Sequence, residues 1–501
     1  MRQQPSAEYR GYRTAGIRLA EDLAPELRQG RESAERAALY AFHAFDKAHV
    51  AMLTEEGIIP HAVGAAILRA FRDMEQEGVE AVRTRIGGGQ HSGEVYLIRR
   101  LGEEVGGWEH LGRSSNDLSA VGRRIRERDR LLDTLAALDA LRATLLDLAR
   151  AHLHTVLPAY FHWQHAQPTT LGHYFTAMAQ ALARDAERGR QAYARVNQSP
   201  AGAVILTGTS FPLRRERTAA LLGFDGVLVN TLDACQDDDH QLDCFGFLAP
   251  LAAHLSRLAE DLSYWSGTEL GYVEVADRYA SGSSILMQMK TPTPTNRIKG
   301  IVSGVVGGMV SAYMAAKTAT GMHTLDRAYG DAPLDAAFDD VVGSLRLLAP
   351  TLASLTVHAE RARQRAADHF AAATDLAGAL VAEKGLPWRT AHQICGILFR
   401  HCAERGLTPA DLTPALLDEA AVEYFGRPVG LGAESIRRAL DPKHFVEART
   451  LLGGPAPDEV ARQGQALGAA LAADQRWLAE RRQALAAAAA ALEEAIDAIL
   501  A

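Results

Sequence analysis

Three polar segments of the chain carry side chains better suited to chemistry than to packing. The first covers residues 112–117 and reads GRSSND, directly ahead of a long helical pattern. Backbone N–H groups at the start of a helix, with hydroxyl and amide side chains beside them, form a site for an anion. The same residue types form a helix N-cap equally well. Alone, this segment predicts either an anion site or a cap.

The second segment covers residues 162–168 and reads HWQHAQP, ahead of a helix that we expect to begin near Thr170. It gathers two imidazoles and two amides, and histidine is the side chain that most readily exchanges protons near neutral pH. A buried, hydrogen-bonded structural histidine is the more common outcome for either His162 or His165 taken alone.

The third segment covers residues 281–292 and reads SGSSILMQMKTP. Loops of small residues often close over substrates, although an ordinary mobile connector fits this pattern equally well. A separate glycine run at residues 87–89 lacks both a following GK[ST] and a preceding strand, so we interpret it as a connector and not as a phosphate site.

Long helices must position these segments. Apolar residues recur every three to four positions over residues 121–154, 170–197, 233–266, 297–322 and 336–371. A 30-residue helix extends about 45 Å, which suits a bundle that reaches beyond one subunit. Leucines crowd the helix predicted at 121–154 more densely than a solvated face requires, so we expect oligomerisation through the central helices. A coiled-coil protein without catalysis remains an alternative for this pattern.

The fold class predicted is all-α, with residues 224–231 as the only short extended piece. We expect three blocks: an N-terminal helical domain at 1–117, a central long-helix bundle at 118–371 and a C-terminal helical domain at 372–501. Prolines divide the last block into short helices before an alanine-rich helix that begins near residue 458.

Composition excludes several classes of protein. The 501 residues are 48% hydrophobic, and 53 Lys+Arg against 61 Asp+Glu give a net charge of −8, which offers no basic face for nucleic acid. No apolar run reaches the roughly 20 residues of a membrane helix, so we expect a cytoplasmic protein without a membrane partner. The four cysteines are expected to be buried and reduced. Residues 237–244 combine acids, His240 and Cys244, but acids at a helix start are usually matched to the helix dipole, and we expect neither a metal nor an organic cofactor.

Taken together, the segments resemble the three signature regions of the fumarase/aspartase superfamily, most closely those of argininosuccinate lyase. Residues 110–117 are similar to the family's HTGRSRND, residues 161–168 to THxQxAQP, and residues 282–292 to GSSxMPQKKNP. Further similarity at 200–212, 230–239 and 441–455 extends the resemblance from about residue 90 to 463.

The resemblance implies a three-domain helical fold that assembles into a homotetramer, and an anti β-elimination from a dicarboxylate or N-succinyl substrate. In that reaction a base removes the proton beside a carboxylate and an acid protonates the departing nitrogen, usually leaving fumarate. It implies Ser283 as the base and His162 as the acid. The substrate contacts that it implies, with positions where this chain departs from the pattern included, are Arg113, Ser114, Ser115, Asn116, Phe161, Gln164, Ser284, Met287, Met289, Lys290 and Asp326.

This chain departs from the family pattern at positions that touch substrate. The lysine that stabilises the aci-carboxylate falls at Met289, and we hypothesise that the adjacent Lys290 supplies the charge. An asparagine is replaced by Thr291, an arginine by Ser115 and a threonine by Phe161. The family's AYNKDLQEDK segment is also lost at residues 325–331, where Asp326 suits a cationic leaving group, so we expect a substrate other than argininosuccinate.

Three functions compete at this point. A carbon–nitrogen lyase, or an amine-adding synthase, is favoured because His162 and Ser283 are present. Another reaction of the same scaffold, such as a carbon–oxygen lyase or a cycloisomerase, suits the altered Met289 and Phe161. A structural, crystallin-like protein without turnover is the third, and the leaving group and the presence of turnover distinguish them.

Overall fold

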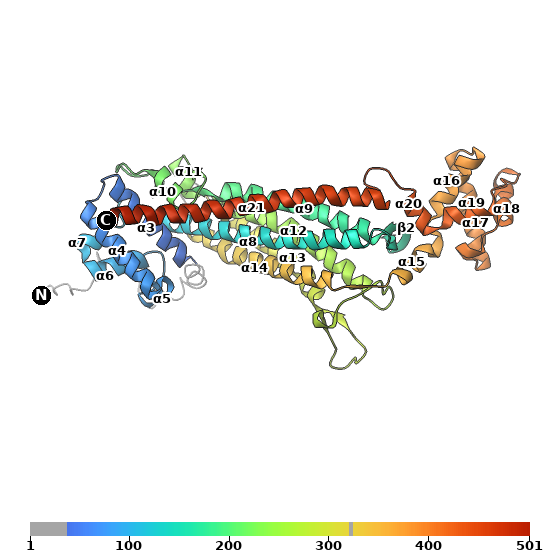
Figure 1. The fold of residues 1–501 in the computed structure, drawn as a ribbon, viewed down its shortest axis with the longest axis horizontal. Helices are drawn as coiled ribbons and strands as arrows, with labels where there is room; N and C mark the ends of the chain where they lie inside the picture. Colours follow the sequence, from blue (N-terminus) through green and yellow to red (C-terminus); the bar gives the residue numbers. More distant parts are fainter. Residues whose placement is uncertain (1–37, 320–323) are drawn as a thin grey trace.

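The structure, a computed structural model, describes residues 38–319 and 324–501, and of residues 324–328 the backbone alone. The Asp326 side chain, predicted to contact substrate, therefore lies outside the described residues. Long helices run side by side along the long axis of the molecule (Figure 1). They are α8 (Ser115–Ala151), α9 (Leu171–Val196), α12 (Asp239–Trp265), α13 (Thr293–Ala316), α14 (Thr324–Ala353) and α21 (Pro457–Leu500). The all-α prediction is confirmed.

Helix α8 is the central rod of this bundle. Its 37 residues span about 55 Å at 1.5 Å per residue. The dense leucines that the sequence analysis noted on this helix are buried against α9, α12 and α21. One continuous apolar core therefore runs along the bundle. The helix thereby fixes the distance between the segments that precede and follow it.

Helix α13 packs between α12 and α14 but leaves part of its apolar surface exposed. Val306, Val310, Tyr313 and Met314 are each at least 37% exposed. Within the described residues, α13 is the one helix long and apolar enough, by length and composition alone, to cross a membrane. A helix in the core of a bundle meets the same criteria, because core helices and membrane-spanning helices both have to be apolar on more than one side.

Smaller helical groups lie at the two ends of the bundle (Figure 1). At one end are α3 (Leu39–Glu55), α4 (His61–Glu77), α5 (Val79–Arg85), α6 (Ser92–Leu101), α7 (Glu103–Gly106), α10 (Arg215–Leu221) and α11 (Thr231–Gln236). At the other are α15 (Ala359–Ala367), α16 (Ala373–Lys384), α17 (Trp388–Arg405), α18 (Pro414–Phe425), α19 (Ala433–Leu440) and α20 (Pro442–Glu447). Each group has its own apolar core, and the end of α21 adds to the core of the first. Division at residues 117 and 371 remains our proposal.

The prediction of a single extended piece was incomplete. A short strand does occur at 224–231, where β4 (Gly226–Val227) pairs with β3 (Gln198–Ser199). The sequence analysis missed the antiparallel hairpin of β1 (Val156–Phe161) and β2 (Gln164–Thr170). Its two-residue turn contains neither glycine nor asparagine, the residues by which such turns are recognised. The remaining strands are two residues long: β5 (Val273–Glu274) pairs with β8 (Thr356–Val357), and β6 (Ala280–Ser281) with β7 (Thr291–Pro292).

All four cysteines are buried free thiols, as predicted. In the acidic segment that was set aside as a metal site, the His240 imidazole bonds to the Glu127 carboxylate. That contact joins α12 to α8 and gives the histidine a structural role.

Candidate active site

The first predicted segment forms the N-terminal cap of α8. The Ser114 Oγ accepts a hydrogen bond from the Asn116 N–H at 3.0 Å and donates one to the Val204 carbonyl at 2.9 Å. The Asp117 carboxylate accepts the Ser114 N–H at 2.8 Å, which completes a capping box. Burial raises the pKa of Asp117 to about 6, although backbone hydrogen bonds oppose this. The cap fixes the segment and leaves it at the positive end of a long helix dipole.

The side chains of this segment point in different directions. The Arg113 guanidinium is buried, with Asp46 at 2.9 Å and the Glu109 carboxylate as partners. The Ser115 hydroxyl lies 2.7 Å from the His91 Nε2. Asn116 is 7% exposed. Because two carboxylates already neutralise Arg113, its charge holds the segment to the N-terminal helices.

The second segment is the tip of the β1–β2 hairpin. His162 and Trp163 form its turn with φ angles of 49° and 60°, a left-handed conformation that costs non-glycine residues about 1 kcal/mol or more each. The Trp163 ring packs on Tyr264 at the end of α12, with centroids 4.4 Å apart. His162, Gln164 and Phe161 are exposed, the last at 69%. Strained backbone that presents an exposed imidazole is typical of functional turns.

The third segment is a loop that the β6–β7 pair closes at its base. The Ser283 Oγ accepts hydrogen bonds from the backbone N–H groups of Leu286 at 3.0 Å and Ile285 at 3.3 Å. These donors are in position to stabilise negative charge on the serine oxygen. Around them the loop is exposed: Ser284 is exposed, Met287 is 96% exposed and Met289 is 44% exposed.

Lys290 is tied to the base of this loop. Its ammonium lies 2.6 Å from Glu274 and 2.6 Å from Asp277, and these hydrogen bonds raise the pKa of Lys290. A cavity of about 750 Å³ lies beside it, lined by Lys290, Glu274, His358 and Arg361 among others. In this loop conformation the charge of Lys290 is therefore already neutralised.

One subunit does not bring the three segments together. The first lies at the start of α8, whereas the hairpin follows the other end of that helix, about 55 Å away. The serine loop precedes α13 and lies toward the same end as the hairpin (Figure 1). A site that uses Ser114 or Asn116 together with His162 therefore needs more than one chain.

Sequence reasoning overlooked His91, which contacts Ser115 directly. The sequence gave little indication of a role for His91, because a single histidine after the glycine run at 87–89 belongs to no recognisable motif. The contact becomes visible only when α6 folds back against the start of α8.

Known proteins that are similar to this chain are lyases. A family model described as lyase matches residues 6–307, and one described as argininosuccinate lyase C-terminal matches 370–447. The argininosuccinate lyase of Methanoculleus marisnigri is 39% identical over 88% of this chain and 89% of that protein. The corresponding protein of Methanothermobacter thermautotrophicus is 38% identical over 82% and 88%.

A solved structure of EDDS lyase in complex with formate is 32% identical to this chain. It superimposes with a TM-score of 0.86 and covers 96% of each chain. The chain therefore belongs to the argininosuccinate lyase family of the fumarase/aspartase superfamily and is a carbon–nitrogen lyase.

Proposed function

We propose that this enzyme eliminates an amine from an N-succinyl-type substrate to give fumarate, or catalyses the reverse addition. The observation that carries the proposal is the pair of backbone N–H groups, from Ile285 and Leu286, that donate to the Ser283 Oγ. Serine is a poor base unless its alkoxide is stabilised, and preorganised N–H donors supply that stabilisation. A loop that excludes water on closing strengthens their effect.

The proposed reaction assigns one proton to each of two residues. The Ser283 alkoxide removes the proton from the carbon beside a carboxylate, and the electron pair moves into that carboxylate. The carbon–nitrogen bond then breaks as the His162 imidazolium protonates the departing nitrogen. Asn116 and the start of α8 bind a substrate carboxylate, with Ser114 and Arg113 holding the segment in place, and Gln164 and Ser284 contact the substrate.

We propose a homotetramer as the working form. The 55 Å that α8 places between the first segment and the hairpin requires at least two chains at each site. The exposed apolar stripe of α13, at Val306, Val310 and Tyr313, offers a face that a second bundle can cover. For the enzyme as a whole, we propose a cytoplasmic location without membrane or nucleic-acid partners. The reduced cysteines and the net charge of −8 support this proposal.

For the substrate, we propose an N-succinyl compound other than argininosuccinate. The support comes from the sequence positions already named: Met289, Phe161 and residues 325–331 lack the polar groups of the family pattern. A binding site built on hydrogen bonds rejects an analogue that cannot make them by factors of about 10⁴. The exposed Met287 and Met289 fit a less polar amine.

The test follows fumarate by its ultraviolet absorbance while the tetramer is offered N-succinyl amines. Ser283→Ala is expected to lower turnover by about 100- to 10,000-fold, the usual worth of a general base. Ser435→Ala is the control and should keep full activity, because Ser435 is a partly buried serine of the C-terminal helices that donates a hydrogen bond to Glu383. Equal activity of Ser283→Ala and Ser435→Ala would exclude Ser283 as the base.

A further inference from the structure

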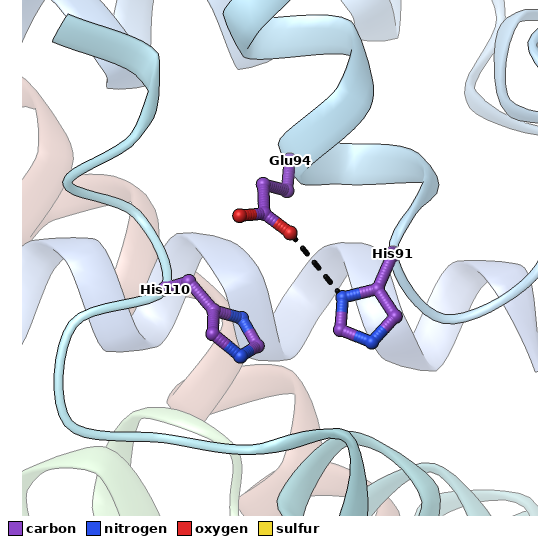
Figure 2. A group of neighbouring side chains, drawn as sticks. All are labelled: His91, Glu94 and His110. Carbon is purple, nitrogen blue, oxygen red and sulfur yellow. Dashed lines mark ion pairs between the residues drawn. The ribbon is translucent and has the colours of Figure 1, made fainter. Parts of the chain in front are cut away.

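His91, Glu94 and His110 form a cluster of three metal-ligand types at the N-terminal end of the bundle. Each offers one nitrogen or oxygen atom, and these atoms lie within 4.8 Å of one another. Figure 2 shows that the three side chains face a common space, with His91 and Glu94 from the start of α6 and His110 from the loop that precedes α8. We infer that this cluster binds one divalent transition-metal ion of the zinc class per subunit.

The spacing between His91 and Glu94 matches that of two ligands of one ion. The His91 Nδ1 lies 3.3 Å from the Glu94 carboxylate, longer than the 2.7 to 2.9 Å that is usual for a charge-assisted hydrogen bond. Two atoms bound about 2.1 Å from a tetrahedral zinc ion lie about 3.4 Å apart. The His91 nitrogen and the Glu94 oxygen are thus already as far apart as two ligands of one zinc ion.

His110 completes the set. Its Nδ1 is buried and has no hydrogen-bond partner in the structure, an arrangement that is costly for a polar atom unless something binds it. A small rotation about the side-chain bonds of His110 closes the remaining distance, and the terminal torsion of histidine is soft.

The surroundings are those of a metal-binding histidine. Metal-bound imidazoles usually donate their second ring N–H to a neighbouring oxygen, which fixes the ring and the tautomer. The His91 Nε2 lies 2.7 Å from the Ser115 Oγ, so that partner is present. The guanidinium of Arg113, an electrostatic neighbour of Glu94, is neutralised by Asp46 and Glu109 and therefore does not repel the ion strongly.

Two nitrogens and one oxygen leave a coordination position open, as in zinc sites that bind a further ligand. Ser115, at the start of α8, contacts the other ring nitrogen of His91. The proposed function places a substrate carboxylate at this helix start, so an ion bound by His91 would add positive charge near the position where Ser115 replaces the family's arginine. This last step rests on the proposed function, whereas metal binding does not.

The test measures metal content and not turnover. The full-length tetramer is stripped with a chelator, dialysed against Zn²⁺, and its bound zinc is counted by elemental analysis; Co²⁺ then reports the ligand geometry by visible absorption. We expect one ion per subunit, with affinity at least about 100-fold weaker in His110→Phe and in Glu94→Gln, and about 10- to 100-fold weaker in Ser115→Ala.

His401→Ala is the matched control, since His401 also lies beside two carboxylates, Glu423 at 2.8 Å and Glu419 at 3.9 Å. It should bind zinc as the unmodified protein does. Circular dichroism establishes that each variant is folded. No zinc uptake by the unmodified protein, or uptake that His110→Phe leaves unchanged, would overturn the inference.

Discussion

Lys290 lies 2.6 Å from Asp277, and its partner Glu274 lies equally close on β5. The loop that carries Ser283 is thereby anchored at its base, and the ammonium of Lys290, the residue after Met289, is paired with these two carboxylates. Lys290 must exchange these carboxylates for the substrate's carboxylate if it replaces the family lysine.

Lys290→Gln is therefore expected to lower kcat/KM by about 100- to 1,000-fold, the usual loss when one group that stabilises a developing anion is removed. Steady-state kinetics with fumarate detection measures it. Lys299→Gln removes a comparable lysine that faces Glu260 at 3.5 Å on the neighbouring helices, and it should have little effect. Similar losses in both variants would show that Lys290 has no special role.

His162→Asn should separate activity from stability. Asparagine tolerates the left-handed backbone that His162 adopts at φ 49°, so the variant is expected to be more stable by up to about 1 kcal/mol while it loses turnover. Calorimetry compares its Tm with that of His162→Ala, which also lacks the acid but gains less from the turn. A Tm for His162→Asn at or below that of His162→Ala would contradict a strained, functional turn.

Mixed tetramers test whether several chains build one site. Asn116→Ala and His162→Asn are each expected to be inactive, yet denatured and refolded together they should recover about a quarter of the activity, because random assembly leaves that share of sites intact. Mixing Asn116→Ala with Ser114→Ala, whose changes lie in one segment, should give no more activity than the two variants show when refolded separately. Equal recovery in both mixtures would refute sites shared between subunits.

Asp139 makes the stability of the bundle depend on pH. Burial raises its pKa to about 6, with the Asp474 carboxylate adding to the shift and Arg142 opposing it. The unfolded value is lower, so between about pH 4 and 6 the folded protein holds a proton that the unfolded chain has lost, and stability falls as the pH rises through this range.

Asp139→Asn removes this titration. The variant is expected to gain about 2 kcal/mol relative to the unmodified protein between about pH 4 and pH 7. Thermal unfolding at both pH values measures the gain. Asp147→Asn, on the exposed face of the same helix, should show none. A gain in Asp139→Asn that does not grow with pH would contradict the assignment.

The sequence predicted the helical fold because period and length are local properties. Helix α9 begins at Leu171, beside the expected residue 170, whereas α8 begins at Ser115 and not at 121, and α12 begins at Asp239 and not at 233. The sequence analysis missed the β1–β2 hairpin because His162 and Trp163 give no turn signal. It also gave no indication that Arg113 is buried against Asp46, or that His91 contacts Ser115. Both contacts join residues that are far apart in the chain, so they depend on how α3 and α6 pack on α8.

The reaction proposed for this enzyme is an elimination that yields fumarate from an N-succinyl compound. The most direct measurement offers the purified protein argininosuccinate and a panel of other N-succinyl amines, including N-succinyl diamines, and records fumarate in both directions of reaction. We predict fumarate from one or more of the other compounds, lost in Ser283→Ala. Release from argininosuccinate alone would contradict the proposed specificity, and no turnover with any compound in either direction would contradict the proposed reaction.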